Sequence, residues 1–175
     1  MFMIYDDRAI YKGNKEIVVK KVYRTKTGGR IDPDIVKLYC KTMEPGTYQE
    51  RGIYYKDIPI EELDDYYRVH YRAAYKGYDV RMDCISYERQ EIQIQTGDDR
   101  GTPRKDELER LGFKVNYFER GAIYTAVVPL DSLEKITRKS YSYKTKERQQ
   151  KIVTKEEFWF EVIEAKSFLE ETRQR

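Results

Sequence analysis

The chain has 175 residues, of which 37% are charged, yet its basic and acidic residues nearly balance and leave a net charge of +3. This balance excludes a strongly cationic protein that coats polyanions, and the length allows one domain or two small ones. No apolar run approaches the roughly 20 residues that a membrane-spanning helix requires, and the first residues lack the pattern of a secretory signal. With only two cysteines, the chain cannot build a disulfide framework. We therefore expect a cytoplasmic protein.

Three short sequences occur twice, in the same order. The pairs are RAIYKG at 8–13 with RAAYKG at 72–77, ERGIYY at 50–55 with ERGAIY at 119–124, and IPIEEL at 58–63 with VPLDSL at 128–133. Repetition at a nearly constant spacing is the signature of a duplicated structural unit. The sequence predicts a tandem duplication, with a first β module at 1–67 and a second at 68–136.

Within each copy the residues predict a run of short antiparallel strands. A strand ending in Tyr-Lys-Gly meets a tight turn and a β-branched second strand follows, which is the pattern of a β-hairpin. Third strands are expected at 34–42 and 91–96, where apolar and polar residues alternate as in a half-buried sheet. A fourth strand follows and ends at a proline. One helical turn comes after the proline, and its leucine, Leu63 or Leu133, is expected to close the core.

Four or five short strands closed by one helical turn form a small barrel. The inferred order resembles that of a Src-homology-3-type barrel, in which a proline-initiated turn precedes the last strand. The resemblance implies a mainly β protein with some α structure, in which a small antiparallel, barrel-like module occurs twice.

A short helix is expected inside the second copy. Thr102 can cap it, Pro103 suits its first turn, and Gly112 fits the position just after its end. These signals predict a helix over 103–111.

The C-terminal part differs in character from the two copies. Residues 137–153 are rich in lysine and arginine and indicate a basic linker. Thr154 and Glu157 then form a capping box, which predicts a helix over 154–172 that packs its apolar stripe against the modules. The apolar residues of this helix are Phe158, Trp159, Val162, Ile163, Ala165 and Leu169.

Candidate catalytic and metal-binding residues are few. His70 is the only histidine, and a strand position among tyrosines explains it better than a role as general base. Cys40 and Cys84 have no partner at metal-ligand spacing and are expected in the core. Asp98 and Asp99 could hold a metal, but a solvated turn explains them better. We expect no catalytic residue, no metal and no cofactor.

The repeated Glu-Arg-Gly is the one polar feature that both copies share. It occupies residues 50–52 and 119–121. A cross-strand ion pair beside a glycine bulge accounts for it better than a duplicated active site does.

Binding is better supported than catalysis, because the chain has 17 tyrosines and tyrosine is enriched at protein interfaces. Barrel walls could use many of these rings, and an interface could use the others. The candidate partner-binding residues are Tyr54, Tyr55, Glu61, Glu62, Asp64, Asp65, Tyr66, Tyr67, Asp98 and Asp99.

In size, charge density, β content and duplication the chain resembles the immunity proteins of bacterial toxin–immunity pairs. The resemblance implies a protein without enzymatic activity that neutralises a cognate toxin by occluding its active site. We expect a monomer or homodimer. Several such toxins are basic nucleases, so the acidic stretches at 60–67 and 97–100 would face the partner.

The alternative is a protein that binds RNA or single-stranded nucleic acid. The segment 138–151 interleaves tyrosines with basic residues, as backbone-tracking proteins do. Its candidate contact residues are Arg138, Lys139, Tyr141, Tyr143, Lys144 and Lys146.

Overall fold

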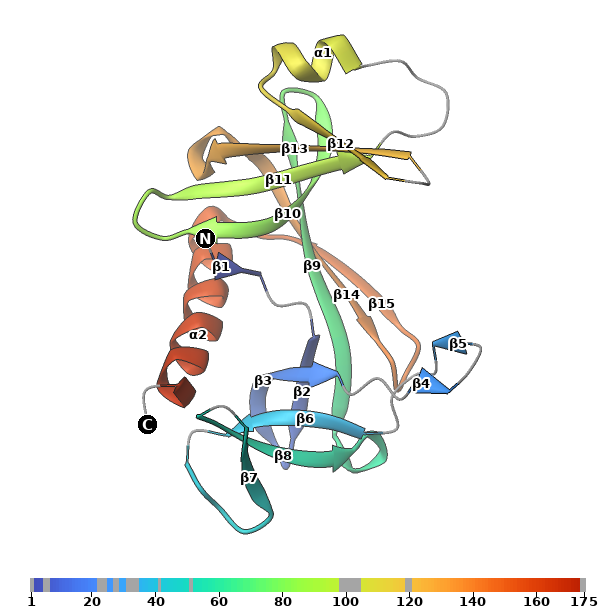
Figure 1. Ribbon diagram of the computed structural model, residues 1–175, viewed down its shortest axis with the longest axis vertical. Helices are drawn as coiled ribbons and strands as arrows, with labels where there is room; N and C mark the ends of the chain where they lie inside the picture. The colour runs from blue at the N-terminus through green and yellow to red at the C-terminus, as the bar shows by residue number, and fades with distance from the viewer. Residues whose placement is uncertain are drawn as a thin grey trace. The chain divides into compact units, whose positions relative to one another are not determined.

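The computed structural model shows a mainly β protein with antiparallel sheets (Figure 1). The described residues are 2–4, 7–21, 25–26, 29–30, 35–40, 42–50, 52–97, 105–118 and 121–173. The prediction of a β-rich chain is confirmed.

The strands before the middle of the chain are short, and most of them belong to one sheet. They are β1 (Phe2–Met3), β2 (Asp7–Tyr11), β3 (Asn14–Lys21), β4 (Thr25–Lys26), β5 (Gly29–Arg30), β6 (Ile35–Cys40), β7 (Thr47–Glu50) and β8 (Ile53–Pro59). The later elements include the longest strand, β9, and two α-helices. They are β9 (Asp65–Tyr75), β10 (Tyr78–Ser86), β11 (Glu91–Gly97), α1 (Lys105–Arg110), β12 (Lys114–Phe118), β13 (Gly121–Pro129), β14 (Glu134–Ser142), β15 (Arg148–Ile152) and α2 (Lys155–Arg173).

The chain divides into two compact units. The first unit comprises Tyr5–Val69, Ser140–Gln149 and Trp159–Arg175. The second unit comprises Met1–Ile4, His70–Lys139 and Gln150–Phe158. The chain leaves the first unit at Val69, two residues after the end of the expected first module, but both units also include distant segments. β9, β14, β15 and α2 each have residues in both.

Within each unit the strands pair in the same pattern. In the first unit the order is β9-β2-β3-β6-β8-β7, and in the second it is β9-β10-β11-β13-β12, with every pairing antiparallel. Along this path the strands of the first unit follow in the order β2-β3-β6-β8-β7, and those of the second follow in the equivalent order β9-β10-β11-β13-β12. In addition, β10 pairs with β1 and β9 pairs with β14.

The Tyr-Lys-Gly sequences make equivalent hairpin turns. Lys12 and Gly13 connect β2 to β3 with φ of 52° and 67°, and Lys76 and Gly77 connect β9 to β10 with φ of 48° and 83°. Two consecutive residues with positive φ define the type I′ turn, whose twist matches that of the strands. The predicted hairpins are confirmed.

The proline-initiated turns are equivalent as well. Each is a single 3₁₀ turn, η1 (Ile60–Glu62) after β8 and η2 (Leu130–Ser132) after β13. Leu63 and Leu133 follow these turns and are each only 1% exposed. The prediction that these leucines lie in the core is confirmed.

The expectation of closed barrels is wrong. Among the described strands, β7 pairs only with β8, and β12 pairs only with β13, so the continuous path of paired strands ends in an open edge at β7 and another at β12. Moreover, β9 pairs with β2 through its first half and with β10 through its second half, so this strand serves both units. The pattern of alternating residues specifies which face of a strand is buried but does not specify whether the sheet closes on itself.

The segment expected to be a basic linker, residues 137–153, forms most of the β14–β15 hairpin instead. Ser142 N donates to Glu147 O at 3.0 Å and Val153 N donates to Ile136 O at 3.0 Å, at the two ends of the hairpin. The high charge of this segment does not prevent strand pairing, because lysine and arginine side chains can point to solvent from both faces of an exposed strand.

Helix α1 ends as predicted. Gly112 has a φ of 90°. Its N–H donates to Glu109 O at 3.0 Å, and Phe113 N–H donates to Leu108 O at 3.0 Å, which is the Schellman motif. The side chains of Leu108 and Phe113 are buried, as the hydrophobic contact of this motif requires. The predicted residues 103 and 104 lie outside the described residues.

Helix α2 begins with the predicted capping box. Glu157 N donates to Thr154 Oγ1 at 3.1 Å, and Thr154 N donates to Glu157 Oε2 at 2.7 Å. Phe158, Val162 and Ala165 are buried, so the apolar stripe is covered along this part of the helix. The side chain of Leu169 lies outside the described part of the structure, and Trp159 and Ile163 are half-buried.

Candidate functional site

A cluster of polar and aromatic side chains lies on one face of the first unit's sheet. Val36 and Leu38 of β6 point into the core with Ile58 of β8. Alternate residues of a strand point to the opposite face. The opposite face therefore carries a set that we call the tyrosine–lysine face, consisting of Lys37, Tyr39, Tyr48, Glu50, Tyr55 and Asp57.

The tyrosine–lysine face is organised around Tyr55, which is 4% exposed. The ring centroid of Tyr55 lies 5.2 Å from that of Tyr39 and 6.2 Å from that of Tyr48. Lys37 Nζ lies 5.0 Å from the ring centroid of Tyr48 and 5.6 Å from that of Tyr55. These distances are in the range of aromatic and cation–π contacts, so neighbouring rings and one cation surround the buried tyrosine.

The charged groups of this face pair with one another. Lys37 Nζ donates to Glu50 Oε1 at 2.6 Å, and Tyr48 Oη donates to Asp57 Oδ1 at 2.6 Å. The hydrogen bond to Glu50 raises the pKa of Lys37 above its ordinary value. Desolvation, followed by the hydrogen bond to Asp57, raises the pKa of Tyr48. Both groups therefore keep their protons at neutral pH.

We expect two substitutions to move the pKa of Tyr48 in opposite directions. Asp57→Asn should lower it, because the carboxylate that stabilises the neutral phenol is lost. Lys37→Gln should raise it, because the ammonium that stabilises the phenolate is lost. The measurement is the ¹³Cζ chemical shift of Tyr48 during an alkaline titration. Equal shifts in both variants would contradict the arrangement.

The second exposed feature of this unit is acidic. Glu61, Glu62 and Asp64 are exposed on and beside η1, and we call them the acidic turn. Asp64 Oδ2 also accepts a hydrogen bond of 2.8 Å from Gly13 N, which connects the turn to the β2–β3 hairpin.

Backbone contacts hold the acidic turn in place. Leu63 N donates to Ile60 O at 3.2 Å and Asp64 N donates to Ile10 O at 2.9 Å. The ammonium of Lys144 donates to the carbonyl oxygens of Leu63 and Glu61. Because Leu63 anchors the turn in the core, the carboxylates project from a fixed backbone.

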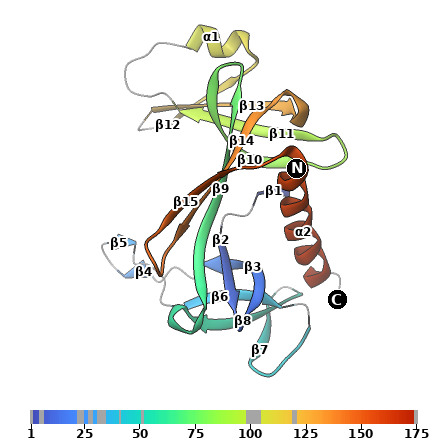
Figure 2. The same cartoon turned by 180° about the vertical axis from the view of Figure 1, so that it is seen from behind.

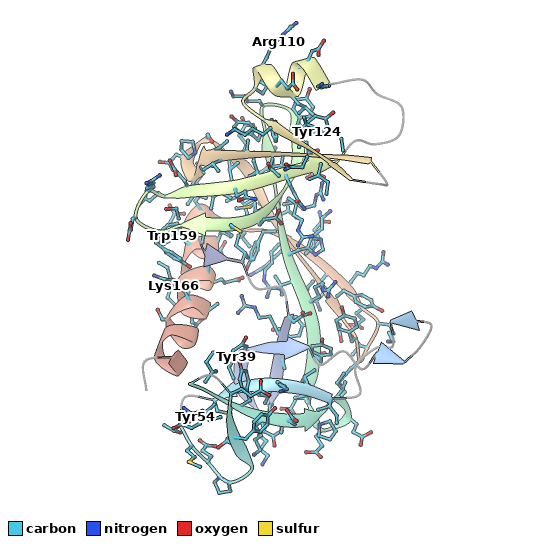
Figure 3. The ribbon with its side chains drawn as sticks, viewed as in Figure 1. Tyr39, Tyr54, Arg110, Tyr124, Trp159 and Lys166 are labelled. Carbon is cyan, nitrogen blue, oxygen red and sulfur yellow. The ribbon has the colours of Figure 1, made fainter. Side chains whose placement is uncertain are left out.

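The structure separates the predicted partner-binding residues by exposure. Tyr55 and Tyr66 are buried, and Tyr66 belongs to the core cluster. Half-buried residues are Tyr54 (labelled in Figure 3), Asp65 and Tyr67. Glu61, Glu62 and Asp64 are exposed. Asp98 and Asp99 lie outside the described residues.

Of the residues considered for nucleic-acid binding, three make contacts within the first unit. The ring of Tyr143 stacks on that of Tyr66 with centroids 4.8 Å apart, and Lys144 binds the carbonyls of Glu61 and Leu63. Tyr141 contacts Tyr143 edge-on at 5.2 Å. The remaining candidates are Arg138 and Lys139, both half-buried, and Lys146, which is exposed.

The other residues considered for chemistry lie apart from these two features. His70 is half-buried in β9, and Cys40 and Cys84 are free and half-buried. Desolvation raises the pKa of both thiols. No group of three or more potential metal ligands occurs within the described residues.

Of the repeated Glu-Arg-Gly, the described residues include Glu50, Gly52 and Gly121. Glu50 forms its ion pair with Lys37, two strands away, and Gly52 lies in the β7–β8 turn with a φ of 80°. Gly121 is instead the first residue of β13. Arg51, like residues 119–120, lies outside the described part of the chain.

Sequence reasoning missed the tyrosine–lysine face. The signal was available, since the alternation of Val36, Leu38 and Cys40 places Lys37 and Tyr39 together on the other side of β6. The pairing of β6 with β8, and of β8 with β7, could not be read from that alternation.

Neither helix in the described part of the chain combines the length and apolar character that a bilayer-spanning helix needs. Comparisons of the chain with family models, curated proteins and solved structures find no match.

Proposed function

We propose that the chain is a protein-binding module without enzymatic activity, and that it neutralises a bacterial toxin by covering a basic active site with the acidic turn. The observation that carries this proposal is the exposure of three carboxylates within four residues, at 61, 62 and 64, on a backbone anchored by the buried Leu63.

A fixed acidic turn suits recognition of a basic surface. Complementary charges steer the encounter of two proteins and reject partners of the wrong sign. A backbone that is already ordered loses little conformational entropy on binding, so more of the interaction energy appears as affinity. The hydrogen bonds from Lys144 to the main-chain carbonyls of Glu61 and Leu63 help to hold the backbone of the turn.

The tyrosine–lysine face supports binding better than catalysis. Its amine and its hydrogen-bonded phenol, Lys37 and Tyr48, keep their protons at neutral pH, so neither can act as a base or nucleophile there. Its rings offer a rigid contact surface at low entropic cost.

We also propose that the two units derive from duplication of one module. The matching strand orders, the paired type I′ turns and the paired 3₁₀ turns support this origin. The module resembles a Src-homology-3-type domain in having a proline-initiated turn before the next strand, although its sheet is open.

The proposed function is tested with the protein encoded beside this chain's gene. We expect the chain to bind that protein and to restore growth to bacteria that express it. Glu61→Gln with Glu62→Gln should weaken binding by roughly tenfold at low salt, because exposed ion pairs are each worth up to about 1 kcal/mol. Titration calorimetry measures the affinity.

The matched control is Glu88→Gln with Glu134→Gln, which removes two exposed carboxylates from the second unit. Equal weakening by the two double variants would assign the effect to net charge and contradict the role of the acidic turn. A chain that binds the neighbouring protein without restoring growth would contradict toxin neutralisation.

A further inference from the structure

Strand β15 is exposed along its whole length. All five residues from Arg148 to Ile152 are exposed, and Ile152 is 64% exposed. Among the described strands, β15 pairs only with β14, which in turn pairs with β9 (Figure 2). The edge of β15 that faces away from β14 therefore has no strand beside it in the described chain.

The corresponding strands of the two units do not have an open edge. The β14–β15 hairpin follows η2 as the β9–β10 hairpin follows η1. The first strand of each hairpin pairs with the first strand of the preceding one: β14 pairs with β9, and β9 pairs with β2. In this comparison β15 corresponds to β3 and β10, which pair on their other edges with β6 and β11. After β15 the chain forms α2 instead of a third strand.

The backbone of β15 has the hydrogen-bonding groups that a third strand would use. The bonds from Ser142 to Glu147 and from Val153 to Ile136 fix the hairpin register. Because bonded and non-bonded pairs alternate along an antiparallel ladder, odd-numbered residues bond to β14. The N–H and C=O groups of Arg148, Gln150 and Ile152 therefore point away from β14.

The charge of the hairpin indicates what kind of segment would pair with it. Residues 138–151 contain six lysines and arginines against one glutamate. Pairing of β15 with a second copy of the chain would bring two such hairpins together, and like charges across a strand pair are destabilising. An acidic strand would be attracted to the hairpin instead.

We propose that β15 binds an extended acidic segment of another protein as an added antiparallel strand, at the place that β6 and β11 occupy beside β3 and β10. Main-chain hydrogen bonds to Arg148, Gln150 and Ile152 provide affinity, and the excess positive charge of the hairpin provides selectivity for an acidic segment. Apolar residues that alternate with the acidic ones, in the pattern of Ile92 and Ile94 in β11, contact the exposed Ile152. This site is separate from the acidic turn and does not depend on it.

The test uses the full chain and a synthetic peptide of about ten residues in which valine and glutamate alternate, a length that matches a typical strand. With the peptide present, amide hydrogen exchange at Arg148, Gln150 and Ile152 should slow about tenfold or more, because these N–H groups become bonded. Gln149 and Lys151 should change little, since they already bond to β14.

Two variants separate backbone pairing from simple charge attraction. Gln150→Pro removes an outward N–H without removing a bond to β14 and should abolish the protection. Arg148→Gln with Lys151→Gln should weaken peptide binding, whereas Arg110→Gln with Lys114→Gln, the same charge change at exposed sites in and beside α1, should not.

Three results would overturn the proposal. One is unchanged exchange in β15 at saturating peptide. Another is stronger protection by oligouridylate than by the peptide, which would assign the hairpin to nucleic acid. The third is protection that rises with protein concentration in the absence of peptide, which would assign the edge to a second copy of the chain.

Discussion

Replacement of Phe158 by alanine is expected to lower the free energy of unfolding by about 3–5 kcal/mol, the usual cost of deleting a buried phenylalanine ring. Phe158 is 0% exposed, and its ring meets the ring of Tyr71 edge-on with centroids 4.9 Å apart. The same substitution should lower the melting temperature by on the order of 10 °C in a chain of this length. Thermal and urea denaturation followed by circular dichroism measure both quantities.

Phe160 provides the matched control, because it lies two residues further along α2 and is 68% exposed. Phe160→Ala should change stability by less than about 0.5 kcal/mol, as surface substitutions usually do. Truncation after Lys151, which removes α2, should reproduce the loss seen with Phe158→Ala and expose apolar surface to a fluorescent dye. If the truncated chain melts like the intact one, α2 contributes to binding and not to folding.

Leu63→Ala and Leu133→Ala are each expected to cost about 2–5 kcal/mol, the range measured for buried leucines. Both side chains are 1% exposed and follow equivalent 3₁₀ turns, so their costs should be similar. Hydrogen exchange should locate the damage, with faster exchange in β6 and β8 for Leu63→Ala and in β11 and β13 for Leu133→Ala.

The exposed neighbour Glu62 gives the control for this pair, and Glu62→Ala should leave stability nearly unchanged. Leu63→Ala should also weaken partner binding through the acidic turn, because the turn loses its anchor in the core, whereas Leu133→Ala should not. A cost below about 1 kcal/mol for either leucine would show that its turn can collapse onto the space left behind.

Features governed by neighbouring residues could be predicted from the sequence. The turns at Gly13 and Gly77 were predictable because two-residue hairpins need positive φ, which glycine adopts without strain. The ends of the helices were predictable from Thr154 with Glu157 and from Gly112, since a cap involves only a few successive residues. The burial of Leu63 and Leu133 followed from their place after a proline-initiated turn.

Features that depend on pairing between distant strands could not be predicted in this way. Whether a sheet closes, and whether β9 serves one unit or both, depends on which edges meet, and residue alternation carries no information about edges. For the same reason the sequence did not place Glu50 beside Lys37 or show that Tyr55 is buried under its neighbours.

The basic C-terminal segment shows the same division. Its composition alone indicated a solvated linker, because six basic residues in fourteen positions oppose burial. In the folded chain β14 pairs with β9, and β15 then pairs with β14 while its side chains remain in solvent. Local chemistry thus determined the turns, the helix caps and the burial of the two leucines. The choice of strand partners, and with it the open edge of β15, depended on the tertiary structure, because strand pairing satisfies backbone N–H and C=O groups that would otherwise lack hydrogen bonds.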